Sequence, residues 1–92
     1  MRVYRYWGGK TELMGSPYFG TEFYSAEDAR RLLALPGGNT AANVTAFRIP
    51  KGTTVLVGDA ACQTGKAGFG DWAVGGGAQI YVPDVSVPIP LP

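Results

Sequence analysis

Residues 3–9, VYRYWGG, have the apolar and aromatic character of a β-strand, with an arginine in the middle of the aromatic run. Successive side chains of a strand point to opposite faces, so Val3, Arg5 and Trp7 share one face. On that face Arg5 lies between two large apolar neighbours, where a guanidinium needs partners for its donors. The pattern therefore predicts an N-terminal strand in which the Arg5 guanidinium has a binding partner.

Residues 25–35 have the spacing of a short amphipathic helix. Ser25 is a suitable N-cap, acidic residues follow in the first turn, and two arginines come later, which suits the helix dipole. Ala29, Leu32 and Leu33 recur at i, i+3 and i+4, and Pro36 and two glycines end the pattern. We expect a helix of roughly ten residues.

Shorter apolar runs predict the remaining elements. Strands are expected around Tyr18 and Phe19 and over residues 43–49, 53–60 and 78–82. The glycine-rich segment 59–77 has no periodic pattern, and because it carries Phe69, Asp71 and Trp72 we interpret it as a binding loop rather than a merely flexible one. The order of elements indicates a single α+β domain over residues 1–92, with a proline-rich tail at residues 84–92 that is an extended edge or a linker.

Composition narrows the chemistry of this domain. A net charge of +1 argues against a large phosphate-binding surface, so no DNA partner is expected. No apolar run approaches a membrane span, and the N-terminus lacks the apolar region of a signal peptide. The chain has no histidine, which excludes Ser-His-Asp and Cys-His nucleophiles and the common zinc sites. An enzyme built from it would work by binding, orientation and electrostatics, or through a carboxylate or an amide.

Three motifs, in their order along the chain, resemble those of mono-ADP-ribosyltransferases of the R-S-E class. VYR at residues 3–5 is similar to the arginine motif of the first strand. PYFGT at residues 17–21, followed by SAEDARRLLAL, resembles the strand and helix that lie behind the nicotinamide pocket. GGGAQI at residues 75–80 stands where the family has a glycine-bearing loop and its glutamate strand. With LALP and IPKGT, the set resembles small ADP-ribosyltransferase domains at the C-termini of Rhs-type and other polymorphic bacterial toxins.

The resemblance implies roles for five residues. Arg5 would hold the phosphates or ribose of NAD, because its rigid fork of donors suits phosphate geometry. Tyr18 or Phe19 would stack against the nicotinamide ring, with Thr21 as the hydroxyl of the second motif. Gln79 would accept a hydrogen bond from the nicotinamide ribose as the glycosidic bond breaks.

Each of these residues also has a purely structural alternative. Arg5 can stack on a neighbouring aromatic ring with its head in solvent. Tyr18 and Phe19 can be ordinary core aromatics, and Gln79 can be a polar strand residue that bonds a neighbouring loop. These alternatives predict structural contacts in place of an open site.

The chain departs from the family pattern at two positions. Gly20 stands where the family has serine, and Gln79 stands where it has glutamate. Glutamine keeps an acceptor for the ribose hydroxyl but loses a charge, which near a water-poor site contributes on the order of several kcal/mol to the transition state. Asp71 or Glu22 is the alternative source of a carboxylate.

The resemblance also implies a fold and a biological role. The fold would be two short packed β-sheets with one main helix, and NAD would lie between the sheets as the substrate, without a metal. The domain would be the C-terminal part of a larger secreted effector, such as one of a type VI system, acting in the cytoplasm of a recipient bacterium. Its partners would be a target protein or RNA and a cognate immunity protein. The alternatives are an NAD glycohydrolase toxin and a non-catalytic β-rich protein-binding module.

Overall fold

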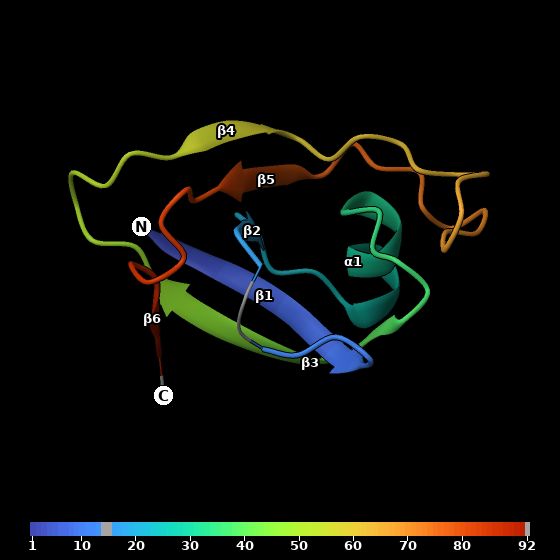
Figure 1. Cartoon of the computed structure of the whole chain (residues 1–92), viewed down its shortest axis with the longest axis horizontal. Helices are drawn as coiled ribbons and strands as arrows, with labels where there is room; N and C mark the ends of the chain where they lie inside the picture. Colours follow the sequence, from blue (N-terminus) through green and yellow to red (C-terminus); the bar gives the residue numbers. More distant parts are fainter. Residues whose placement is uncertain (14–15, 92) are drawn as a thin grey trace.

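The computed structural model describes residues 1–13 and 16–91 and has an α+β architecture (Figure 1). In chain order the elements are β1 (Arg2–Gly9), β2 (Tyr18–Gly20), α1 (Ala26–Leu32), β3 (Asn39–Arg48), β4 (Leu56–Asp59), β5 (Ala78–Tyr81) and β6 (Ile89–Pro90). Within the described residues the strands form one antiparallel sheet in the order β4-β5-β2-β1-β3-β6. The predicted α+β class is therefore confirmed, and the tail contributes β6 as an edge strand.

The expectation of two separate packed sheets is wrong, because one hydrogen-bonded sheet contains all six strands. Its two halves are nevertheless joined at a single position, where Tyr4 of β1 pairs with Gly20 of β2. Beyond that pair β1 stays with β3, and β2 stays with β5. Pro17 precedes β2 and has no N–H to offer β1, while its carbonyl accepts from Val82 N at 2.8 Å. The sheet consequently opens between β1 and β2.

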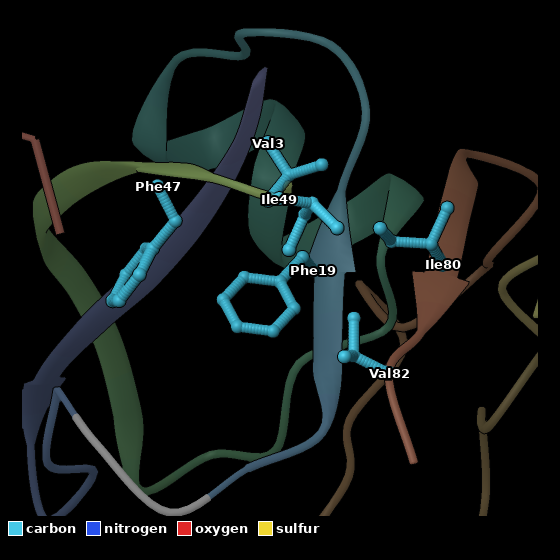
Figure 2. Close-up of a cluster of buried hydrophobic side chains, with 6 residues drawn as sticks. All are labelled: Val3, Phe19, Phe47, Ile49, Ile80 and Val82. Carbon is cyan, nitrogen blue, oxygen red and sulfur yellow. The ribbon is translucent and has the colours of Figure 1, made fainter. Parts of the chain in front are cut away.

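The main apolar core lies on one face of the sheet around Phe19 (Figure 2). Side chains from β1, β2, β3 and β5 and from the segments that follow β3 and β5 meet there: Val3, Phe19, Phe47, Ile49, Ile80 and Val82. The rings of Phe19 and Phe47 make an edge-to-face contact with centroids 5.1 Å apart. This cluster joins the two halves of the sheet where they still lie together.

Helix α1 covers the other face of β1. Its N-cap is confirmed, since the Ser25 hydroxyl accepts from the Asp28 backbone N–H at 3.2 Å. Ala29 is fully buried and packs in a cluster with Tyr6 and Ala41. The helix has seven residues, fewer than predicted, because the chain turns into the left-handed region at Ala34, with φ of 49°. In the part of the chain that the structure describes, no helix is long and apolar enough to span a membrane.

The glycine-rich segment 59–77 lies beside the C-terminal end of α1 (Figure 1). Gly75 N donates to Arg31 O and Gly77 N donates to Leu32 O, both at 2.9 Å. These bonds satisfy carbonyls that the end of a helix leaves without partners. Trp72 Nε1 donates to Leu35 O at 3.0 Å, and the Arg30 guanidinium lies 4.7 Å from the centre of the Trp72 ring. The segment is thus a loop, as predicted, but one attached to the helix at several points.

Candidate active site

A cleft of about 530 Å³ opens where β1 and β2 separate. One wall comes from the strands and the β1–β2 connection, and the other from the end of α1, the turn after it and the 59–77 segment. The predicted residues Arg5, Tyr18, Phe19 and Gln79 all line this cleft, although they come from three strands that are far apart in the sequence. Thr21 is not among the residues that line it, and its backbone N–H donates to Ala78 O at 3.4 Å.

Gln79 occupies an open position in the sheet. It pairs with Gly20 on one side and with Gly58 on the other, so neither neighbouring strand places a side chain beside it. Its residue is half-buried, and no side-chain hydrogen bond of the described residues that line the cleft involves its amide; those bonds are made by Arg5, Tyr6, Ser16 and Asn39. The structural alternative, a glutamine bonded to a neighbouring loop, is not the arrangement found here. The amide faces the cleft free to bind a ligand.

Arg5 is buried, with only 8% of its surface exposed. Its terminal nitrogens donate to the carbonyls of Glu12 and Ser16 at 3.3 and 3.4 Å, which are long for hydrogen bonds. Its Nε is also buried and has no partner among the described residues. Arg5 is therefore not an exposed arginine with its head in solvent, and burial lowers the pKa of its guanidinium. Its donors are incompletely satisfied beside an open cleft.

Tyr18 and Phe19 point to opposite faces of β2, as alternation requires. Phe19 is 5% exposed and belongs to the main core, so its structural alternative holds even though it also reaches the cleft lining. Tyr18 is 50% exposed and packs against Tyr81, with ring centroids 5.2 Å apart. Of the two aromatics, Tyr18 offers a ring surface to a ligand.

The two carboxylates considered as substitutes for the missing glutamate lie outside the cleft lining. Glu22 accepts from the Tyr24 hydroxyl at 3.3 Å, and Asp71 is exposed in the 59–77 loop. Among the described residues that line the cleft, none is an aspartate or a glutamate. In the same described part of the chain, no three His, Cys, Asp or Glu side chains gather as they would around a metal ion.

Sequence reasoning named Phe69 only as part of a binding loop, and it assigned no place in the cleft to Gln63 or Asn39. Gln63 and Phe69 come from the glycine-rich loop, where no periodic pattern indicates which side chains turn inward. Asn39, at the start of β3, is buried, and its amide is already bonded on both sides. It donates to Tyr6 O and accepts from Ala41 N, both at 2.9 Å. Asn39 thus shapes the cleft, whereas Gln63 carries an amide with no partner among the described residues.

Comparison with known proteins gave no matching family model, no matching curated protein and no matching solved structure. The case for a function therefore comes from the motifs in the sequence and from the geometry of the cleft.

Proposed function

We propose that this domain cleaves the bond between nicotinamide and ribose in NAD and transfers the ADP-ribose to a target macromolecule. The observation that carries the proposal is the meeting of Arg5, Tyr18 and Gln79 in one cleft, in the order that the resembling enzymes use. The Gln79 amide and the Arg5 Nε have no partner among the described residues, and Tyr18 has an exposed ring; such groups suit a nucleotide with a flat, charged ring.

The chemistry suits a site without a strong acid. Nicotinamide in NAD is a pyridinium cation, so when its bond to ribose C1′ breaks, the bonding pair returns to the ring nitrogen and neutral nicotinamide leaves. Positive charge then develops on the ribose, and the lone pair of an acceptor forms the new bond to C1′ while the proton of the acceptor passes to water. The Gln79 oxygen would accept from a ribose hydroxyl and orient the sugar, and Arg5 would hold the diphosphate.

One observation favours a second candidate, hydrolysis of NAD. No carboxylate is found among the described cleft residues, so the site has no evident base to deprotonate and orient a protein or RNA acceptor. Water needs less positioning than a macromolecule. On the side of α1, the cleft is lined by the loop residues Ala60, Ala61 and Gln63. An NAD glycohydrolase would use Arg5, Tyr18 and Gln79 in the same way, with water as the acceptor.

We further propose the biological setting that the resemblance implies. The domain would act in the cytoplasm of a recipient bacterium, as the delivered end of a larger effector, and an immunity protein would cover the cleft. An apolar row next to the cleft residue Tyr18 supports such a contact. It crosses three strands through the pairs of Leu56 with Tyr81 and of Tyr81 with Tyr18; Leu56 and Tyr18 are exposed and Tyr81 is half-buried.

The deciding experiment incubates the purified domain with NAD labelled in the adenosine part, with and without a bacterial lysate. Transfer predicts label on one macromolecule and nicotinamide release that depends on the lysate. Hydrolysis predicts equal nicotinamide release without the lysate and no labelled macromolecule. Gln79→Ala is the inactive control. Absence of nicotinamide release in both samples would exclude both reactions and leave a non-catalytic binding module.

A further inference from the structure

The cleft has a second end, away from Gln79. The cleft lining extends from Gln79 and Gly20, which lie level with Tyr4 of β1, to Asn39, which pairs with Gly9 of β1. These two positions of β1 are separated by on the order of 16 Å at the usual rise of a strand. The residues that line the far end are Leu35, the last residue of the second motif, and four residues outside the three motifs, Pro36, Asn39, Gln63 and Phe69.

Backbone hydrogen bonds hold the loop residues at this end. Gly37 N donates to Gly68 O at 2.8 Å, which keeps Phe69 beside the turn that follows α1. Gln63 N donates to Ala73 O at 2.9 Å, next to Trp72 and its bond to Leu35 O. The side chains of Gln63 and Phe69 therefore line the cleft from a backbone that hydrogen bonds hold in place.

The chemistry of this end fits a purine base. The half-buried ring of Phe69 and the aliphatic walls of Leu35 and Pro36 suit a flat apolar surface, and aromatic rings stack well on bases. Asn39 cannot read a base edge, because both ends of its amide are bonded to backbone. The amide of Gln63 has no such partner in the described chain, and a glutamine amide matches the donor and acceptor edge of adenine.

We infer that the far end of the cleft is the adenine subsite, in which Phe69 stacks on the base and Gln63 reads its edge. The inference rests on the proposed NAD cleavage, since it names the part of the substrate that this end binds. Arg5 lines the cleft next to Tyr4, and its buried Nε has no partner among the described residues, so it would bind a diphosphate that links the two nucleosides. The subsite would make the enzyme prefer a dinucleotide over nicotinamide mononucleotide.

The test measures binding apart from cleavage. Calorimetry with ADP-ribose should show affinity losses on the order of tenfold for Gln63→Leu and for Phe69→Ala. Phe23→Ala removes an exposed ring outside this cleft and should leave the affinity unchanged. Replacing adenine with hypoxanthine should weaken binding to the wild type, but hardly to Gln63→Leu. Circular dichroism verifies folding, and Gln63→Leu keeps the backbone bonds of the loop.

Cleavage kinetics separate this inference from the proposed function. Both variants should raise the KM for NAD by a factor on the order of ten and leave cleavage of nicotinamide mononucleotide unchanged. NAD cleavage with unaltered ADP-ribose affinity in both variants would overturn the adenine subsite alone. ADP-ribose binding that depends on Gln63 and Phe69, without any cleavage of NAD, would overturn the proposed function alone.

Discussion

One face of the β2–β5 pair is buried and the other is open, although the residues of the two faces alternate along the same short strands. On one face Phe19 pairs with Ile80, and both are buried in the main core (Figure 2). On the other face Gly20 pairs with Gln79, and both line the cleft. The difference arises from side-chain volume, because two large apolar residues close one face, while on the other face Gly20 has no side chain beside the Gln79 amide and leaves room for Leu33. One short ladder thereby supplies stability on one side and a candidate site on the other.

The largest expected effect is on the closed face. Ile80→Ala should lower the free energy of unfolding by about 2–5 kcal/mol, because it leaves a cavity under a side chain that is fully buried. Chemical denaturation of the folded domain measures this. Val57→Ala is the matched control, since Val57 pairs with Ile80 across β4 and β5 but is 72% exposed, and its effect should stay within about 0.5 kcal/mol. Equal losses in the two variants would refute the assignment of the core.

The next prediction concerns the open face. Gln79→Ala should lower the rate of NAD cleavage by about 10²–10³-fold, the usual effect of removing one group that acts in the transition state. NAD affinity and the unfolding midpoint should hardly change, because the Gln79 amide bonds no described residue. Gln79→Glu should retain or raise the rate, since it adds the charge that the resembling enzymes use. A folded Gln79→Ala domain with undiminished cleavage would remove Gln79 from the site.

Variants of Arg5 test whether the boundary between the two halves of the sheet binds NAD. Arg5→Ala should weaken NAD binding about tenfold to a hundredfold, or roughly 1.5–3 kcal/mol, through loss of a charge-assisted contact. It should also destabilise the domain, because Arg5 bonds the carbonyls of Glu12 and Ser16. Arg5→Lys keeps the charge without the fork of donors and should lose less affinity. Arg48→Ala, an exposed arginine of β3, is the control, and equal NAD affinity in all four proteins would contradict the role of Arg5.

The smallest predicted effect concerns the attachment of α1 to β1. The Tyr6 hydroxyl donates to Tyr24 O at 3.1 Å and accepts from Tyr24 N, and burial raises the pKa of Tyr6. The neutral phenol is thus favoured in the folded state, so its contribution is complete at neutral pH and is lost as the pH rises past about 10. Tyr6→Phe should lower the free energy of unfolding by about 1 kcal/mol at pH 7 and flatten its fall above pH 10. Chemical denaturation at pH 7 and above pH 10 measures this, and an unchanged fall in the free energy of unfolding above pH 10 would contradict it.

Local features of the sequence were sufficient for the separate elements. The strand β1, the N-cap at Ser25 and the proline-glycine turn after α1 are set by neighbours in the chain, and the structure confirms each. The opposite directions of Tyr18 and Phe19 follow from strand geometry alone. Arg5 and Gln79, which the motifs single out, both line one cleft, and their roles in it stay predictions.

Only the tertiary structure decided which face of each strand is buried and which loop residues line the cleft. Phe19 rather than Tyr18 is buried because Phe47, Ile80 and Val82 cover its side, and these partners come from distant strands. Gln63 and Phe69 reach the cleft because bonds from Gly37 and Ala73 attach their loop near the end of α1. Such contacts depend on pairing between segments far apart in the chain, for which glycine-rich sequences carry no periodic signal.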